Sequence, residues 1–263
     1  MNDAIQSAKG LLLDLNGVFY VGNRTIPGAK EAIDWLRDRR LPFRFVTNNT
    51  TESIGSLCQS LTSMGLPIFP EEIISAPYGA VLYLRKINHP KCYLLLSREV
   101  RQDFAEFTVS ESDASVVVLG DMGDEWNYQA YNRAFRLLIQ GASVVALHKS
   151  KYWQWEGGLH IDIGAFIAGL EDATDQTALM VGMPAPSFYG LALEELGLPA
   201  EEVVMIGDDI EADVGGAQAL GIKGVLVKTG KYREALVQQS VIKPDGVMDS
   251  IGAIASLFSS AGA

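Results

Sequence analysis

The sequence predicts an α/β fold: a doubly wound parallel sheet that forms a core, with a second, smaller α/β unit inserted into it. Short apolar runs without a helical period, such as the one over 11–13, alternate with amphipathic segments of helical period. Strands that alternate with helices in this way form parallel sheets with helices on both faces. From about residue 76 the alternation starts afresh, which indicates the inserted unit.

The elements predicted before the insert deliver polar residues to loops. We expect, in chain order, a strand over 11–13, a helix over 29–40, a strand over 43–46 and a helix that ends near 64–65. The first strand ends at Asp14, and the second runs into a polar cluster that starts at Thr47. Because parallel strands end at one edge of their sheet, Asp14 and Thr47 should lie at the same edge.

The insert and the rest of the core continue the alternation. For the insert we expect a helix over 78–86, strands over 92–96 and 115–119, a helix over 126–139 and a strand over 143–147. The core should resume with strands over 178–182, 203–206 and 224–227 and with helices over 188–196 and 213–220. The predicted domains are therefore residues 1–75 and 178–263 for the core and residues 76–177 for the inserted domain.

Composition limits the classes of function. The 263 residues are 48% hydrophobic and carry a formal net charge of −11. Nucleic-acid backbones are bound through an excess of Lys and Arg, so a nucleic-acid partner is not expected. No segment has the ~20 consecutive apolar residues of a membrane span, and the N-terminal residues lack the apolar stretch of a signal peptide. Cys58 and Cys92 stand in unrelated segments and predict neither a disulfide framework nor a zinc site, so we expect a cytoplasmic protein without a membrane partner.

Carboxylates follow two of the predicted buried strands. Asp14 ends the first strand, and Asp208 and Asp209 follow the strand over 203–206 after a single glycine. Because burial of an unpaired carboxylate is costly, a metal ion, a basic side chain or a phosphate-binding loop must neutralise it. Three acids at the ends of two buried strands are typical of a site for a hard cation such as Mg²⁺.

Four motifs stand in chain order: DLNGV at 14–18, TNN at 47–49, VGMP at 181–184 and GDDIEADVGGA at 207–217. Together they resemble the ordered motifs of the haloacid dehalogenase (HAD) superfamily of phosphohydrolases. The last motif, followed by VKTGKY at 227–232, is similar to the branch of nitrophenylphosphatase-like enzymes and phospholysine phosphohistidine inorganic pyrophosphate phosphatase. The resemblance implies a Rossmann-like HAD core, a cap domain in the insert, and Mg²⁺-dependent hydrolysis of a small phosphorylated compound.

The resemblance also implies a role for each motif residue. Asp14 would be the nucleophile that forms an aspartyl-phosphate, which water then hydrolyses. Thr47 and the amides around Asn48 and Asn49 would bind the phosphoryl oxygens at a strand-to-helix junction. The residues that would hold Mg²⁺, or complete and support its shell, are Asp14, the main-chain carbonyl of Asn16, Asp208, Asp209 and Asp213.

Two positions depart from the pattern of the family. Asn16 stands where most members have a second Asp, which protonates the leaving group and later activates water, and an amide cannot exchange a proton in this way. The phospholysine branch has Ser there, so hydrolysis of compounds with good leaving groups is still expected. Met183 occupies the phosphate-binding position where the family has a Lys, so one positive charge is missing. Lys149, Lys228 or Lys231 is a candidate to replace it.

The sequence leaves alternatives open. The Thr47 cluster could instead cap the next helix, and for Asp213 a capping role has as much support as a role beside the metal. We assign no chemistry to His148 or His160, which we expect to be packing or surface residues. Two functions remain: a phosphatase, or a catalytically impaired homologue that binds a phosphorylated ligand or a protein partner. A homodimer stays open as the assembly.

Overall fold

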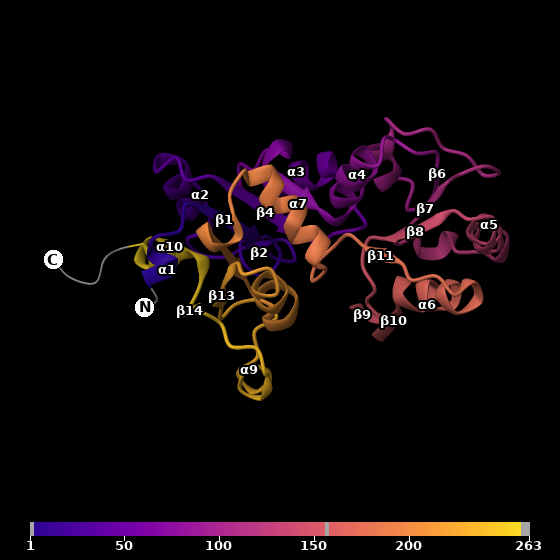
Figure 1. Ribbon diagram of the computed structural model, residues 1–263. Coiled ribbons are helices and arrows are strands. Elements are labelled where there is room, and N and C mark those ends of the chain that lie inside the picture. The colour runs from indigo at the N-terminus through magenta and orange to yellow at the C-terminus, as the bar shows by residue number, and fades with distance from the viewer. Residues whose placement is uncertain (1–2, 156–157, 259–263) are drawn as a thin grey trace. The chain divides into compact units, whose positions relative to one another are not determined.

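The computed structural model describes residues 3–155 and 158–258 of the chain. By their contacts the described residues divide into two compact units (Figure 1). Unit 1 takes its residues from Met1–Thr47, Gly55–Ile74 and Met183–Ala263, and unit 2 from Asn48–Ile54 and Ser75–Gly182. Each unit contains a parallel sheet with helices packed on it, so the predicted α/β fold class is confirmed.

Unit 1 is built on a six-stranded sheet in the order β14-β13-β12-β1-β4-β5. In chain order its strands are β1 (Gly10–Asp14), β4 (Phe43–Thr47), β5 (Ile73–Ser75), β12 (Val203–Gly207), β13 (Lys223–Val227) and β14 (Gly246–Met248). The chain builds outward from β1 to β5, and then builds β12 to β14 on the other side of β1. The direction of winding therefore reverses between β1 and β12, and doubly wound sheets bind ligands at the carboxyl ends of their strands at such a reversal.

The two strands at this reversal are buried along their whole length. Both are apolar runs without alternation, which is the pattern of central parallel strands covered on both faces. β1 pairs in parallel with β12, with Leu13 opposite Ile206, and with β4, with Asp14 opposite Val46. Asp14, Thr47 and the residue that follows β12 therefore leave the sheet at the same edge.

Helices and short turns complete unit 1. β2 (Tyr20–Val21) and β3 (Arg24–Thr25) form an antiparallel hairpin after β1. The helices are α1 (Asp3–Gln6), α2 (Ala29–Asp38), α3 (Ile54–Ser63), α7 (Pro186–Leu196), α8 (Gly216–Gln218), α9 (Glu234–Gln239) and α10 (Ile254–Leu257). The tighter or wider turns are η1 (Pro70–Glu72), η4 (Ala200–Glu202), η5 (Ile210–Gly215) and η6 (Ile251–Ala253). α2 packs with η6 and α10, whereas α7 packs with β4 and α8.

The segment after β12 differs from the helix predicted over 213–220. A wide π-type turn, η5, comes first, and the short α8 follows it. In η5 the N–H of Val214 donates to the carbonyl of Asp209 at 3.2 Å, one residue further back than in an α-helix. The side chain of Asp209 accepts the N–H groups of Glu211 and Ala212, each at 3.0 Å. These local bonds to Asp209 hold the wide turn, which helix periodicity alone does not indicate.

Unit 2 is built on a four-stranded sheet in the order β11-β8-β7-β6, in which every pair is parallel. Its strands are β6 (Cys92–Leu95), β7 (Val116–Leu119), β8 (Ser143–Ala146) and β11 (Leu179–Met180), and β9 (Tyr152–Trp155) and β10 (Gly158–Ile161) form a separate antiparallel hairpin. We expected the strand over 178–182 to return to the core sheet, but β11 pairs with β8 instead. An apolar run does not specify which sheet it joins.

The contacts also assign Asn48–Ile54 to unit 2. The division into a core and a cap as functional domains stays a prediction.

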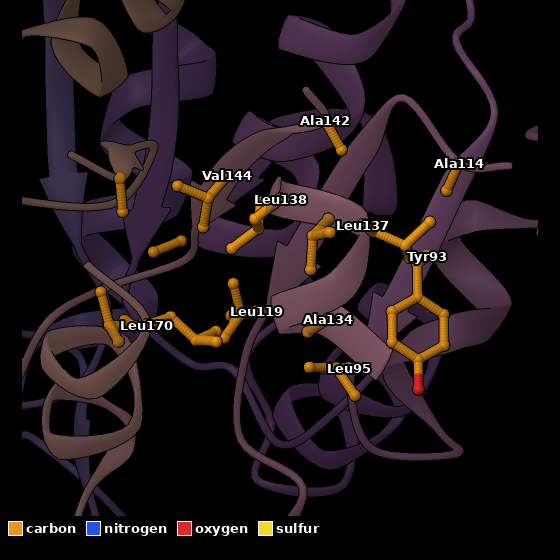
Figure 2. Close-up of a cluster of buried hydrophobic side chains, with 14 of the residues drawn as sticks. Tyr93, Leu95, Ala114, Leu119, Ala134, Leu137, Leu138, Ala142, Val144 and Leu170 are labelled. Atoms are coloured by element: carbon orange, nitrogen blue, oxygen red, sulfur yellow. The ribbon is translucent and has the colours of Figure 1, made fainter. Parts of the chain in front are cut away.

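Among the residues of unit 2 that the structure describes, three helices cover the sheet: α4 (Ala76–Lys86), α5 (Tyr128–Ile139) and α6 (Ile163–Thr174), with the short turns η2 (Val100–Phe104) and η3 (Gly123–Glu125). Leu137 and Leu138 of α5 pack with Leu95 and Leu119 of the strands in one buried cluster (Figure 2). At one edge of this cluster the hydroxyl of Tyr93 points away from the aliphatic side chains and donates to a backbone carbonyl at 3.3 Å. None of the helices that the structure describes is long and apolar enough to cross a membrane.

Candidate active site

Three buried carboxylates come together at the carboxyl ends of β1 and β12. Asp14 ends β1, Asp208 follows β12, and Asp213 lies in η5. One oxygen atom of each lies within 4.8 Å of the corresponding atoms of the other two. The exposed fractions of the three residues are 7%, 2% and 2%. Carboxylates this close in a buried place repel one another, so protons or a cation must neutralise part of their charge.

The pKa values of the three acids reflect this crowding. Burial, followed by the charges of Asp213 and Asp208, raises the pKa of Asp14 well above its usual value. Burial also raises the pKa of Asp213 to about 7, although a hydrogen bond from the N–H of Asp209 opposes the shift. The pKa of Asp208 is raised by burial as well, and the N–H of Lys231 lowers it in part. Burial therefore makes ionisation of each of the three acids less favourable, and a nearby positive charge opposes this effect.

Lys231 is a cation that faces this group. Its backbone N–H donates to Asp208 Oδ2 at 2.6 Å, and its ammonium nitrogen lies 3.3 Å from Asp209 Oδ2. Desolvation lowers the pKa of Lys231, but the charges of the surrounding carboxylates, that of Asp209 first, raise it above the usual value. The side chain is 69% exposed, so water screens part of this attraction.

The other two lysines considered from the sequence have partners elsewhere. Lys149 forms an ion pair with Glu171 within unit 2, and Lys228 lies 2.9 Å from the exposed Asp249. Of the three candidates, Lys231 is therefore the one whose charge the structure brings to the carboxylates.

Two glycines leave room for Asp208. Gly17 and Gly230 have φ values of 97° and 58°, a region that residues with a side chain rarely adopt. A Cβ atom would lie 1.8 Å from Asp208 Oδ2 if it were added to Gly17, and 1.9 Å if it were added to Gly230. The hydroxyl of Thr229 donates to the carbonyl of Gly17 at 2.5 Å, so the loops after β1 and β13 meet at Asp208.

Asp209 and Asp213 have different tasks in the turn. Asp209 caps η5 with its side chain and faces Lys231, so it is not a member of the buried group of three. Asp213 Oδ2 accepts the N–H of Asp209 at 2.9 Å. Asp213 therefore belongs to the buried group and also binds the main chain of the residue that caps η5, so both roles considered for it stay open.

The remaining predicted residues of unit 1 take separate places. Asn16 is exposed in the loop after β1, and Thr47 is 3% exposed at the end of β4. Met183 is buried and precedes Pro184 through a cis peptide bond. A neutral thioether thus stands at the position where the family pattern has a Lys.

Asn48 and Asn49 belong to unit 2, so the border between the units falls inside the polar motif, between Thr47 and Asn48. The side-chain oxygen of Asn49 accepts the N–H groups of Thr51 and Glu52 at 3.0 and 3.2 Å. The next helix, α3, begins only at Ile54. The alternative in which the Thr47 cluster caps this helix is therefore wrong, because a structured loop separates the two.

Sequence reasoning did not single out Tyr189 of α7. Its side chain is fully buried, and its hydroxyl donates to the carbonyl of Ala212 at 2.7 Å. The bond holds the turn that carries Asp213. No local signal marks such a residue, because its partner lies more than one element away in the chain.

Comparison with known proteins assigns the chain to a family. The model of a haloacid dehalogenase-like hydrolase matches residues 11–110, and a second HAD-hydrolase-like model matches residues 180–254. The chain belongs to the haloacid dehalogenase-like hydrolase family, as its ordered motifs predict.

Individual relatives cover nearly the whole chain. It is 40% identical over 230 residues to haloacid dehalogenase-like hydrolase domain-containing protein 2 of Homo sapiens, which is 88% of each chain. It is 36% identical over 250 residues to phospholysine phosphohistidine inorganic pyrophosphate phosphatase of Xenopus laevis, which is 92% of each chain. The structure matches that of 4-nitrophenylphosphatase from Thermotoga maritima with a TM-score of 0.89 and 25% identity, over 97% of this chain and 99% of the other.

The crowded carboxylates predict how stability depends on pH in metal-free protein. The pKa of Asp213 rises from 3.8 to about 7 on folding, so the folded state holds this proton more tightly than the unfolded state does. Its contribution to stability is fully present below the unfolded pKa and is lost as pH rises through the folded value. Melting temperatures in a chelator, measured between about pH 4 and 7, should therefore fall more steeply for the native chain than for Asp213→Asn. Equal slopes for the two proteins would contradict the assignment.

Proposed function

We propose that the chain is a Mg²⁺-dependent phosphatase that hydrolyses a small phosphorylated compound through an aspartyl-phosphate on Asp14. The observation that carries the proposal is the group of three buried carboxylates at the reversal between β1 and β12. The relatives named as phosphatases of phosphoamino acids, pyrophosphate and nitrophenyl phosphate support it. Unit 1 would be the catalytic core, and unit 2 would be the cap that selects the substrate.

The donor set at the carboxylates fits Mg²⁺. Carboxylate and carbonyl oxygens are the ligands that this ion prefers, and a cation would relieve the repulsion that, together with burial, raises the pKa values of the acids. Asp14 and Asp208 would hold the ion with the main-chain carbonyl of Asn16, and Asp213 would support them. When bound, the ion offsets the repulsion between the carboxylates and a phosphate dianion.

Asp14 would carry the covalent step. One of its oxygens attacks phosphorus while the bond from phosphorus to the leaving oxygen breaks, and water then hydrolyses the acyl-phosphate to release phosphate. Thr47 and the amides of Asn48 and Asn49 would bind the phosphoryl oxygens. Because the amide of Asn16 is too weak an acid to protonate the leaving oxygen, that oxygen would take its proton from water.

Lys231 would supply the positive charge that Met183 does not. The exposed ammonium already lies 3.3 Å from a carboxylate oxygen beside the buried group, so a phosphoryl group bound there would meet its field. Asp209 would then act by holding η5 and orienting Lys231 rather than by binding the ion.

A catalytically impaired homologue that binds a phosphorylated ligand is the second candidate. The neutral, buried Met183 and the amide of Asn16 favour it, because each removes a group that assists phosphoryl transfer. Release of phosphate from a panel of small phosphorylated compounds, with and without Mg²⁺, separates the two functions.

The metal assignment predicts a specific loss in Asp208→Asn. The change removes one anionic ligand and little volume, so the affinity for Mg²⁺ should fall about tenfold or more while the fold is kept. The metal-free variant should melt at the same temperature as the native chain or higher, because one repulsive charge is gone. Calorimetric titration measures the affinity, with Asp249→Asn as a control at an exposed carboxylate. Unchanged affinity in Asp208→Asn would refute the assignment.

The leaving group provides a second test. Without an acid at position 16, hydrolysis of a simple sugar phosphate should be at least ~10²-fold slower than that of nitrophenyl phosphate, an acyl phosphate or a phosphoramidate. Steady-state rates of the purified chain with Mg²⁺ give the ratio. Comparable rates for all substrates would show that another group donates the proton.

The role of Lys231 predicts a charge exchange. Lys231→Met keeps the backbone N–H that binds Asp208 but removes the ammonium, and should lower kcat/KM about 10- to 100-fold. Met183→Lys should raise activity in the native chain and restore it in Lys231→Met, because it places a charge at the family's position. Lys228→Met is the matched control, since its partner Asp249 is exposed, and should keep full activity. Full activity in Lys231→Met would rule out the role.

A further inference from the structure

Tyr189 of α7 lies against the segment that carries Asp213, and both belong to unit 1. The buried hydroxyl of Tyr189 donates to the carbonyls of Ala212 and Asp213 at 2.7 and 3.2 Å. A Cβ atom added to Gly216, the first residue of α8, would lie 2.7 Å from a ring carbon of Tyr189. The ring and the hydroxyl therefore both contact the main chain of this segment.

The wide turn η5 changes which backbone groups pair. In an α-helix the N–H of Gly216 would donate to the carbonyl of Ala212, four residues earlier. Here that N–H donates to the carbonyls of Glu211 and Asp213 instead. The hydroxyl of Tyr189 bonds to the carbonyl of Ala212, so it replaces a helical hydrogen bond that the wide turn gives up.

The wide turn also decides where the carboxylate of Asp213 lies. Asp213 Oδ2 accepts the N–H of Asp209 at 2.9 Å, and a Cβ atom added to Gly207 would lie 2.2 Å from the same oxygen. The carboxylate is therefore pressed against the end of β12, where it joins Asp14 and Asp208 in the buried group. Because Asp213 is part of η5, a fit this close depends on the shape of the turn.

We infer that Tyr189 is a positioning residue for the cation site. Its hydroxyl stabilises the wide turn, and the wide turn holds the carboxylate of Asp213 beside Asp14 and Asp208. The inference rests on the proposed function, in which Asp213 supports the ligands of Mg²⁺. Tyr189 acts through the main chain of η5, to which its hydroxyl is bonded.

Calorimetric titration of the full chain with Mg²⁺ tests the inference. Tyr189→Phe removes the hydroxyl and keeps a ring of nearly the same volume. The dissociation constant of this variant for Mg²⁺ should be about 3- to 10-fold higher than that of the native chain, because η5 loses a hydrogen bond that holds Asp213 in place. Far-UV circular dichroism of the variant should match that of the native chain, since the fold is kept.

A double variant shows whether Tyr189 acts through Asp213. Asp213→Asn should itself raise the dissociation constant, because it removes a charge that supports the ligands. If the hydroxyl acts through this carboxylate, adding Tyr189→Phe to Asp213→Asn should raise the constant by less than about twofold. Equal fold-changes in the two backgrounds would show that the residues act independently, and the inference would be wrong.

Tyr131→Phe is the matched control for stability. The hydroxyl of Tyr131 also donates to a backbone carbonyl, that of Phe166 at 2.6 Å, but within unit 2. This variant should have a lower melting temperature in a chelator and an unchanged affinity for Mg²⁺. If Tyr189→Phe behaves in the same way, Tyr189 is merely structural and the inference is refuted.

The outcomes distinguish the inference from the function beneath it. If the native chain neither binds Mg²⁺ nor hydrolyses nitrophenyl phosphate, the proposed function is wrong and the inference is overturned with it. If the native chain binds Mg²⁺ and Asp213→Asn binds it equally well, the inference alone is wrong, because Tyr189 then has no supporting carboxylate through which to act.

Discussion

Repulsion among Asp14, Asp208 and Asp213 is the constraint on which the architecture of unit 1 depends. Parallel pairing of β1 with β12 brings the first two acids to one edge of the sheet, and η5 adds the third. Burial of each carboxylate alone costs free energy, and their mutual repulsion adds to this cost. A positive charge is therefore favourable at the reversal of the sheet. Extensive hydrophobic packing around β1 and β12 offsets the free energy that burial of the acids costs.

The main chain packs closely around the carboxylate of Asp208. Gly17 and Gly230 approach its carboxylate on backbone conformations that a side chain would strain. The N–H of Lys231 donates to the same carboxylate, so the loops after β1 and β13 meet at the side chain of Asp208. Backbone groups, rather than long side chains, thus make these close contacts with Asp208.

Local sequence signals sufficed for the fold class and for the placement of Asp14 and Asp208. An apolar run that ends in an acid can be recognised because the change from apolar to charged residues takes place within a few positions. The approach of Asp213 was not predictable in the same way, since it depends on a wide turn held by bonds within η5. β11 was placed in the wrong sheet and Lys231 could only be named as a candidate, because strand pairing and loop closure are long-range events that composition does not encode.

The segmentation of the chain between the two units has a consequence for synthesis. Unit 2 draws on residues up to Gly182, whereas unit 1 still lacks β12, β13 and β14 when that residue has been made. Domains commonly fold as units while the chain emerges from the ribosome. All residues of unit 2 are thus made before those of β12, which pairs with β1 in the native sheet. Asp208 and Asp213, whose charges raise the pKa of Asp14, are among the residues made after Gly182, so the group of three acids is complete only once most of the final third of the chain has been made.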